Sequence, residues 1–285
     1  SAIWIPNMLG NIPDWDVIRK VADKHNLLVI EDSADTLGGT LRGKPTGSRS
    51  DISITSFYGS HIINCAGNGG WVGMDDSKMA RKARLLRSWG RTSSEFVDIA
   101  EAESLKKRFG IELNGIEYDA KFVFETVGYN LEGNEVGASF GLAQLKKLNK
   151  NIITRQENFK KQCDFFNKYK EYFSNPEETY GINTAWLAFP ILINEDAPFS
   201  RKEFQIYLEE RNIQTRVVFT GNITKQPMCE NIELKKSKNG FPNSDAVMER
   251  GVLLPLHHGM TNEMFERLHA TIETFIKNKT ENIKK

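Results

Sequence analysis

The spacing of apolar residues changes twice within the first thirty positions of the chain. Ala2–Pro6 is a short apolar run, residues 13–26 carry apolar side chains at helical spacing, and Leu27–Ile30 is apolar without interruption. A continuous apolar run of this length is typical of a parallel strand that is covered on both faces. Strand, helix and strand in this order predict a right-handed βαβ unit, and therefore an α/β fold with a mostly parallel central sheet.

Another strand pattern begins at residue 52 and leads into a glycine-rich segment. Ile52–Phe57 alternates apolar and hydroxyl side chains, which predicts a strand with one buried face that ends near Tyr58. His61 and several glycines follow, and glycine lets the backbone approach a ligand closely. Open α/β sheets bind ligands beyond the carboxyl ends of their strands. The residues alone therefore predict a small-molecule site near Asp32, Ser56 and His61.

The remaining chain continues to alternate between strand and helix patterns, except over residues 90–119, which are irregular. Ser200 and Glu203 form the sequence signature of a capping box at the start of a helix. Strands are predicted over residues 71–74, 186–193 and 215–219, and helices over residues 75–89, 136–148, 151–173, 200–211 and 262–277.

Composition and charge exclude several classes of function. The net charge of +1 favours neither nucleic acid nor a membrane surface as a partner. No apolar run approaches the roughly 20 residues of a membrane helix, and no signal peptide opens the chain, so the predicted location is the cytoplasm. Cys65, Cys163 and Cys229 are far apart and form no CxxC motif, which predicts neither a disulfide framework nor a metal site.

Residues 51–70 resemble the cofactor loop of the DegT/DnrJ family of fold-type I, aspartate aminotransferase-like enzymes. These enzymes use pyridoxal 5'-phosphate (PLP) and act on nucleotide sugars. In the family, a Ser/Thr-x-Phe strand end leads to a lysine that carries the cofactor as a Schiff base, and a Gly-Gly turn follows. His61 stands in the place of this lysine. The exchange resembles a small branch of the family, the sugar 3-dehydratases.

The same resemblance implies roles for two aspartates and a serine, each with a structural alternative. Glu31-Asp32-x-Ala is similar to the family motif whose aspartate pairs with the pyridinium nitrogen of the cofactor, although Asp32 is equally compatible with capping the next turn. Asp35 stands where many members have a glutamine near the ring. Ser56 matches the hydroxyl that faces the cofactor phosphate, and its alternative is a strand hydroxyl satisfied within the sheet.

Two further residues match the family more weakly. Asn130 belongs to a Gly-Tyr-Asn motif whose asparagine reaches the cofactor phosphate of the partner subunit in a homodimer with shared active sites; alternatively, it is a turn residue. The Glu132 that follows departs from the basic residue of the pattern. Arg216 lies in a segment that resembles the substrate-side strand, which makes it a candidate contact for the sugar nucleotide or for the glutamate carboxylate. Its alternative is a structural ion pair.

The histidine has a chemical consequence within this resemblance. An imidazole cannot hold the cofactor covalently, which favours the amine form, pyridoxamine 5'-phosphate (PMP), regenerated by L-glutamate. An imidazole is also the side chain that most often transfers protons in both directions near neutral pH, which is the role implied for His61. The resemblance therefore implies dehydration at C-3 of a nucleotide-linked 4-keto-6-deoxyhexose for deoxysugar and polysaccharide biosynthesis. An iron–sulfur cluster, which needs four thiolates, is not expected from three scattered cysteines.

Two alternative functions remain open, and the resemblance also implies a division of the chain into domains. The alternatives are an aminotransferase of the same family that uses another lysine, and a non-catalytic fragment or assembly domain.

Residues 1–150 are expected to be the remainder of the large PLP-binding α/β domain, and residues 151–285 a linking helix and a small α+β domain. The abrupt start within a strand predicts an N-terminally truncated fragment that is inactive by itself.

Overall fold

The computed structural model describes residues 1–96 and 104–281 of the chain. Two compact units make up the fold, and the chain passes between them several times. The predicted division into domains at residue 150 stays a prediction. The first unit consists of Ser1–Pro6, Asp16–Ala34 and Gly47–Lys146, and the second of Asn7–Trp15, Asp35–Thr46 and Lys147–Lys285.

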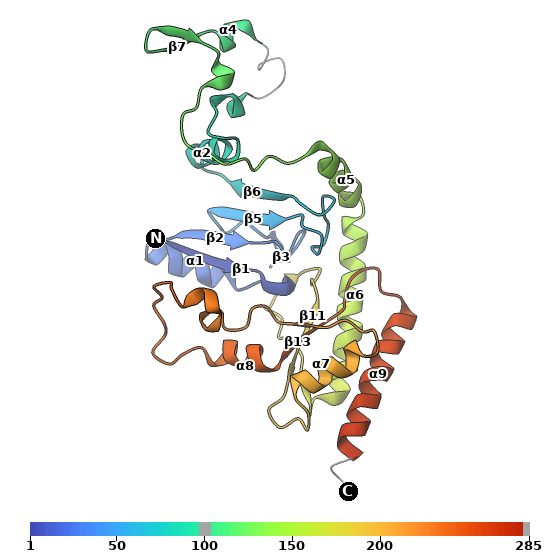
Figure 1. Ribbon diagram of the computed structural model, residues 1–285. Helices are drawn as coiled ribbons and strands as arrows, with labels where there is room; N and C mark the ends of the chain where they lie inside the picture. Colours follow the sequence, from blue (N-terminus) through green and yellow to red (C-terminus); the bar gives the residue numbers. More distant parts are fainter. Residues whose placement is uncertain (97–103, 282–285) are drawn as a thin grey trace. The chain divides into compact units, whose positions relative to one another are not determined.

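The first unit is built on a four-stranded sheet in the order β1-β2-β5-β6 (Figure 1). β1 (Ala2–Pro6), β2 (Leu28–Asp32) and β5 (Ile52–Ser56) are parallel, and β6 (Gly70–Met74) runs antiparallel to β5. The helix α1 (Trp15–Lys24) lies between β1 and β2 in the chain. The predicted βαβ unit and the α/β class are therefore confirmed.

The burial of this sheet differs from the prediction in one respect. Val29 of β2 is completely buried, but Leu28, which points to the other face, is 45% exposed, and Trp4 of β1 is 64% exposed. In β5, every residue is half-buried instead of one face being buried. The predictions of full cover for β2 and of one buried face for β5 were therefore wrong for the described residues.

The rest of the first unit contains one hairpin that the sequence analysis missed. β7 (Ile111–Leu113) and β8 (Ile116–Tyr118) pair antiparallel inside the segment predicted to be irregular. The helices of this unit after β6 are α2 (Ser77–Arg87), α4 (Leu105–Arg108) and α5 (Glu135–Leu145).

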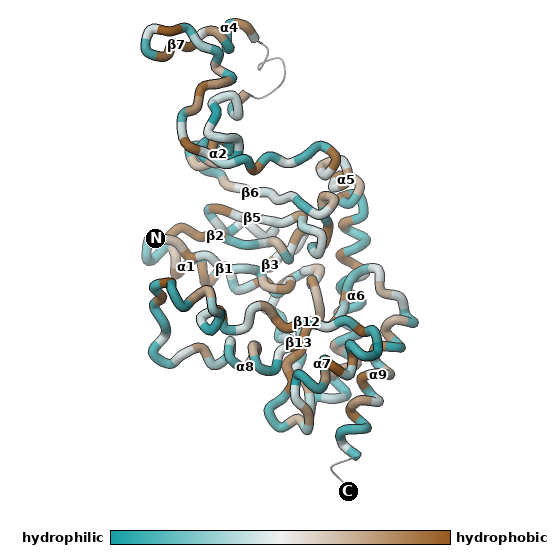
Figure 2. Tube along the Cα trace, viewed as in Figure 1, coloured by the Kyte–Doolittle hydropathy of each residue, from teal (hydrophilic) through white to brown (hydrophobic). Residues whose placement is uncertain are grey.

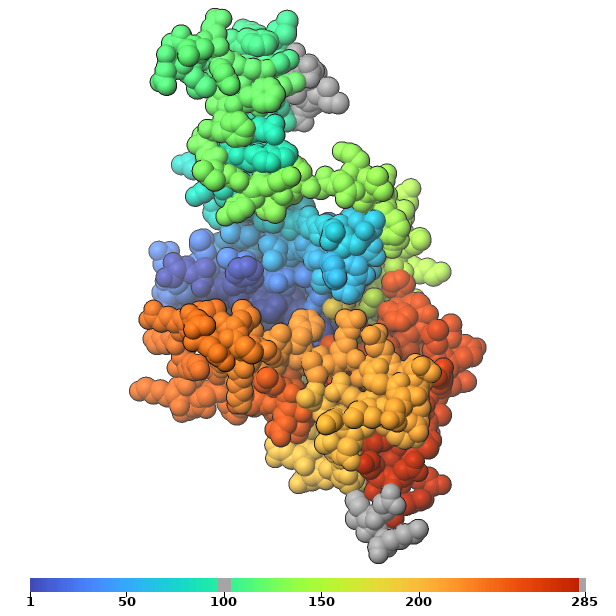
Figure 3. Space-filling view, in the orientation of Figure 1, coloured from blue at the N-terminus to red at the C-terminus, as the bar shows by residue number. Residues whose placement is uncertain are grey.

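Apolar side chains of α5 lie at the surface of the first unit, where Figure 3 shows this helix in green. Val136 is 77% exposed, Leu142 64% and Leu145 52%. Amphipathic surface helices normally turn such residues inward. The described residues therefore leave apolar side chains on more than one side of α5 uncovered.

The second unit is organised around an antiparallel sheet in the order β12-β13-β11-β9. Its strands are β9 (Phe173–Ser174), β11 (Phe189–Ile193), β12 (Arg216–Val217) and β13 (Gly251–Leu254). A smaller sheet joins β10 (Ile182–Asn183), β3 (Thr40–Leu41) and β4 (Lys44–Pro45) in that order. The helices of this unit are α6 (Leu148–Phe166), α7 (Arg201–Glu209), α8 (Pro242–Arg250) and α9 (Asn262–Glu281).

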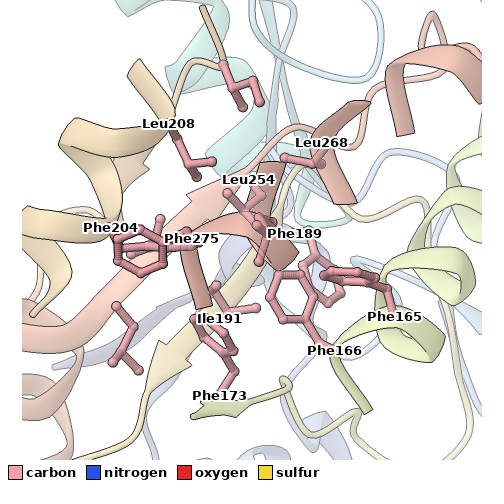
Figure 4. Packing of buried hydrophobic residues seen from close by; sticks show 14 of the residues in the cluster. Phe165, Phe166, Phe173, Phe189, Ile191, Phe204, Leu208, Leu254, Leu268 and Phe275 are labelled. Carbon is pink, nitrogen blue, oxygen red and sulfur yellow. The ribbon is translucent and has the colours of Figure 1, made fainter. Parts of the chain in front are cut away.

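The main hydrophobic core lies in the second unit. Apolar residues concentrate around β12 and β13 in Figure 2. Figure 4 shows aromatic rings from β9, β11 and three helices packed together, including Phe166, Phe189, Phe204 and Phe275, all of which are at most 2% exposed. Aromatic pairs of this kind stabilise a core beyond the area that they bury.

A stripe of buried polar residues on α6 holds loops of the second unit in place. Arg155, which is 3% exposed, donates from Nη1 to the carbonyl oxygens of Trp186 and Leu187, each at 3.0 Å. Burial lowers the pKa of Arg155 to about 10. Asn158 on the same helix donates to the carbonyl oxygen of His257 at 3.1 Å. The helix thus anchors the loop that leads into β11 and the loop that follows β13.

The helices agree with the sequence prediction at their starts better than at their ends. The capping box of α7 is confirmed, since Ser200 Oγ accepts a hydrogen bond from the backbone N–H of Glu203 at 3.3 Å. The helix predicted over residues 151–173 ends earlier, at Phe166, because Phe173 pairs with β11 as part of β9. None of the helices in residues 1–96 and 104–281 is long and apolar enough to cross a membrane.

Candidate functional site

Asp32 and Ser56 lie at the same edge of the parallel sheet, each as the last residue of its strand. In the β2–β5 pair, Asp32 is the partner of Ile54. Because side chains alternate along a strand, Asp32, Ile54 and Ser56 share one face of the sheet, and Glu31 points to the opposite face. The structure thus brings two of the predicted site residues together at the carboxyl edge, where α/β sheets bind ligands.

The carboxylate of Asp32 keeps one oxygen available. Its Oδ1 accepts a hydrogen bond from the backbone N–H of Ala34 at 3.1 Å, so the turn-capping alternative describes a contact that exists. For Oδ2, the residues that the structure describes provide no hydrogen bond. The carboxylate of Asp32 can therefore cap the turn through Oδ1 and still accept a hydrogen bond from a ligand through Oδ2.

The hydroxyl of Ser56 has a similar division of roles. Its Oγ accepts a hydrogen bond from the backbone N–H of Tyr58 at 3.2 Å. This bond uses a lone pair of the oxygen and leaves the hydroxyl proton free to be donated. A phosphate group, which only accepts hydrogen bonds when fully ionised, is a suitable partner for that proton.

His61 lies on a loop that is closed tightly at its base. The backbone N–H of Phe57 donates to Gly69 O at 2.9 Å, and the N–H of Cys65 donates to Phe57 O at 3.0 Å. The side chains of Ile62 and Ile63, directly after His61, are at most 4% exposed. His61 itself is partly exposed, with its Nδ1 atom buried and its backbone N–H donating to Tyr58 O at 3.1 Å. The loop therefore holds the backbone of His61 against Tyr58, two residues after the end of β5.

The packing of this loop against α5 is a feature that the sequence analysis missed. A Cβ atom on Gly141 would lie 2.4 Å from Cys65 Sγ, and one on Gly137 would lie 2.9 Å from Cys65 O. The two glycines are one helical turn apart and face the loop together. Their spacing in the sequence is a signal for close packing, but the sequence does not reveal the partner.

Of the other three predicted residues, Asn130 belongs to the first unit, and Asp35 and Arg216 belong to the second. Asp35 is buried in the second unit, where its Oδ2 accepts a hydrogen bond from the backbone N–H of Leu9 at 2.8 Å. Asn130 is exposed in the first unit and forms an isolated bridge with Ser88. The roles predicted for these residues stay predictions.

Arg216 lies on β12 of the second unit and is exposed. Within residues 1–96 and 104–281, no carboxylate forms an ion pair with it. The structural ion pair considered as its alternative therefore does not occur in the described part of the chain, and the guanidinium is accessible to a ligand.

These features define an α/β protein with a candidate small-molecule site at the carboxyl edge of a parallel sheet. The sequence pattern of the DegT/DnrJ/EryC1/StrS aminotransferase family matches residues 1–273. The chain therefore belongs to this family, as its cofactor-loop motif predicted.

Individual relatives agree with this assignment. The chain is 32% identical to the lipopolysaccharide biosynthesis protein RfbH of Salmonella typhimurium, over 96% of this chain and 62% of RfbH. It is also 32% identical to the dTDP-4-dehydro-2,6-dideoxy-D-glucose 3-dehydratase of Saccharopolyspora spinosa, over 96% of this chain and 59% of that protein. The chain thus spans about 60% of the length of these curated relatives.

A solved structure supports the fold class. The GDP-4-keto-6-deoxy-D-mannose-3-dehydratase of E. coli with bound hydrated PLP superposes with a TM-score of 0.80 at 25% identity, over 95% of this chain and 67% of the other. The predicted fold-type I architecture is thereby confirmed.

Proposed function

We propose that the protein is a PLP/PMP-dependent 3-dehydratase of a nucleotide-linked 4-keto-6-deoxy sugar. The observation that carries this proposal is His61, which follows the β5 strand end where the family motif has its cofactor-binding lysine. Similarity to two proteins named as sugar 3-dehydratases supports the same reaction. The product would serve deoxysugar and polysaccharide biosynthesis, which agrees with the similarity to RfbH.

The residues of the candidate site fit the cofactor. Asp32 Oδ2 can accept a hydrogen bond from the protonated pyridine nitrogen, and the Ser56 hydroxyl can donate to the phosphate. A Cβ atom on Gly67 would meet no atom within 4 Å, so the loop leaves open space at this glycine. When bound in the amine form, the cofactor supplies an amine that condenses with the sugar ketone and a ring that accepts electrons.

His61 would perform the proton transfers. Because its Nδ1 atom is buried, we assign the transfers to Nε2. This nitrogen takes a proton from the carbon that carries the cofactor amine and gives a proton to the C-3 hydroxyl of the sugar, which leaves as water. Acid–base catalysis by one positioned side chain contributes about 10²–10⁴-fold to a rate.

Other residues would bind the reactants and the second subunit. Arg216 is positioned by β12 as an exposed cation, suited to the diphosphate of the sugar nucleotide or to the carboxylate of L-glutamate. The exposed apolar side chains of α5 and the exposed Asn130 support a homodimer in which Asn130 reaches the partner's cofactor phosphate. For Asp35 we propose a contact near the ring.

The aminotransferase reaction is the second candidate, because it is the reaction after which the family is named. The two candidates differ in whether a lysine binds the cofactor covalently. A trapping experiment on the full-length protein distinguishes them: PLP is added, the sample is reduced with borohydride, and adducts are located by peptide mass spectrometry. The variant His61→Lys serves as a positive control, since it restores the residue of the family motif.

We expect no site-specific lysine adduct in the wild-type protein, while glutamate still converts PLP to PMP. His61→Lys is expected to give an adduct at residue 61. A single stoichiometric lysine adduct in the wild-type protein would instead establish the aminotransferase candidate. Transamination of the sugar that persists at full rate in His61→Asn would also refute the dehydratase mechanism.

A further inference from the structure

Glu31 is a buried carboxylate to which the proposed reaction assigns no role. It is 1% exposed and lies on β2 directly before Asp32, on the opposite face of the sheet. Its two oxygens each accept a hydrogen bond, Oε1 from Ser33 Oγ at 2.7 Å and Oε2 from the backbone N–H of Gly47 at 2.8 Å. Burying a carboxylate is unfavourable unless such hydrogen bonds compensate, so an apolar residue would be the simpler choice here.

Ser33, the residue held by Glu31, ties the end of β2 to β5. Its backbone N–H donates to Ile54 O at 2.8 Å, and its carbonyl oxygen accepts from Thr55 Oγ1 at 3.3 Å. The next residue, Ala34, donates its backbone N–H to Asp32 Oδ1 at 3.1 Å. Glu31 is therefore connected to the carboxylate of Asp32 by its hydrogen bond to Ser33, the peptide bond from Ser33 to Ala34, and the hydrogen bond from Ala34 to Asp32.

We propose that Glu31 is a positioning residue for the cofactor-binding carboxylate. From behind the sheet, it fixes the turn formed by residues 32–34, and this turn orients Asp32 so that Oδ2 faces the ligand. The inference rests on the proposed function, because Asp32 has this task only in a protein that binds a pyridine-containing cofactor. Supporting residues of this kind determine whether a site is precise or loose.

The substitution Glu31→Gln tests the inference with little change in shape. The amide oxygen can still accept from the backbone N–H of Gly47, but the amide NH2 can only donate, so the hydrogen bond with Ser33 must reverse its direction and loses the strength that the carboxylate charge gave it. Ser33→Ala removes the same connection from its other end and leaves the carboxylate in place. If both act through one series of contacts, the effect of the double variant is smaller than the sum of the two single effects.

Asp51→Asn provides the matched control. Asp51 lies at the opposite end of the same strands, where Oδ2 accepts from the backbone N–H of Val29 at 2.7 Å and from Arg19 Nη1 at 2.9 Å. The substitution makes the same chemical change in the same sheet, and it is expected to lower stability as well. It has no hydrogen-bonded connection to Asp32 through the turn, so it is not expected to alter cofactor binding.

The measurement is the binding of PLP and PMP to the full-length protein, together with a pH titration of the absorbance of the bound ring. We expect Glu31→Gln and Ser33→Ala to weaken binding about 10-fold and to shift the titration of the ring nitrogen. Asp51→Asn should change the dissociation constant less than 2-fold and leave the titration in place, and Asp32→Asn should abolish the protonated-ring signature.

The outcomes separate the two proposals. If Asp32→Asn abolishes the signature but Glu31→Gln and Ser33→Ala bind like Asp51→Asn, the positioning role is refuted and the proposed function stands. If Glu31→Gln does not fold, Ser33→Ala alone decides, since it retains the buried carboxylate. A wild-type protein that binds neither form of the cofactor overturns both proposals.

Discussion

The contact between α5 and the His61 loop predicts an unusual response to a substitution in the middle of a helix. Gly141 lies inside α5, and a Cβ atom added there would be 2.4 Å from Cys65 Sγ. Two effects of Gly141→Ala therefore oppose each other. Alanine favours the helix over glycine by about 1 kcal/mol. Overpacking in a well-packed region costs about 1–3 kcal/mol.

The distance decides which effect prevails. Carbon and sulfur atoms at 2.4 Å overlap deeply, so the loop or the helix must move. We therefore take the upper part of the overpacking range, and Gly141→Ala is expected to lower the free energy of unfolding by about 1–2 kcal/mol. For a chain of this length, such a change lowers the melting temperature by roughly 2–8 °C.

The effect of Gly141→Ala on the free energy of unfolding should have the opposite sign once the sulfur of Cys65 is removed. In a Cys65→Ala background, Gly141→Ala no longer meets Sγ, and the helix preference should raise stability by about 0.5–1 kcal/mol. Gly137→Ala is the matched control, because its Cβ atom would meet the backbone oxygen of Cys65 at 2.9 Å. Substituting the side chain of Cys65 does not remove that oxygen, so Gly137→Ala should destabilise both backgrounds.

The assay is thermal and urea denaturation of the four combinations at positions 65 and 141, with the two Gly137→Ala variants. A coupling energy of about 2 kcal/mol between positions 65 and 141 is expected. Stabilisation by Gly141→Ala in the wild-type background, or equal effects in both backgrounds, would refute the described packing of the loop against α5.

Three further predictions concern the second unit. Burial lowers the pKa of His269 to about 4 from its ordinary 6.5, so the unfolded chain binds a proton at higher pH than the folded one. The contribution of His269 to the free energy of unfolding should be present above pH 6.5 and fall by at most about 3 kcal/mol toward pH 4. Urea titrations at several pH values should give a smaller slope for His269→Phe than for the wild-type protein, while His257 and His258, whose pKa values are also lowered, keep part of it. Ser200→Ala removes the N-terminal cap of α7 and should cost about 1 kcal/mol, measured by thermal denaturation against Ser200→Thr, which keeps the hydroxyl. Arg155→Met leaves the carbonyl oxygens of Trp186 and Leu187 without their donor. It should lower the free energy of unfolding, measured by urea denaturation, by about 2–4 kcal/mol. A change below about 0.5 kcal/mol would show that these two hydrogen bonds contribute little to stability.

The sequence predicts local elements well where one element's own pattern decides. Ala2–Pro6 forms a strand with the bounds that were predicted, and the capping box at Ser200 starts a helix. The missed hairpin also had a local signal. Its turn contains Asn114 and Gly115, both with positive φ, and Asn-Gly is the typical pair for a tight hairpin turn.

Features that depend on contacts between distant segments were not predictable in the same way. The early end of α6 follows from the pairing of Phe173 with β11, which no periodicity near residue 173 reveals. The exposure of Leu28 likewise depends on what other segments cover, and an apolar run cannot show that.

The candidate site likewise contains residues that a local sequence pattern reveals and residues that only contacts between distant segments reveal. Asp32, Ser56 and His61 were found because strand ends and glycines are visible in the sequence, and the resemblance supplied their expected roles. Glu31 and Cys65 were missed because their significance lies in partners across the sheet and on a helix. Sequence patterns indicate which residues reach a site, whereas the contacts that hold these residues in place appear only in three dimensions.

The alternation of side chains along β5 also limits how this protein can change in length over evolution. Asp32 and Ser56 share a face only because Ser56 lies two positions after Ile54, the register partner of Asp32. Insertion or deletion of a single residue within 52–56 would turn Ser56 toward the face of Glu31 and away from the candidate site. The loop that precedes β5 is not subject to this alternation, and its only requirement here is that Gly47 and Asp51 keep their contacts with Glu31 and Val29. Within a lineage of such proteins, length differences should therefore accumulate before β5, while the strand itself keeps its number of residues.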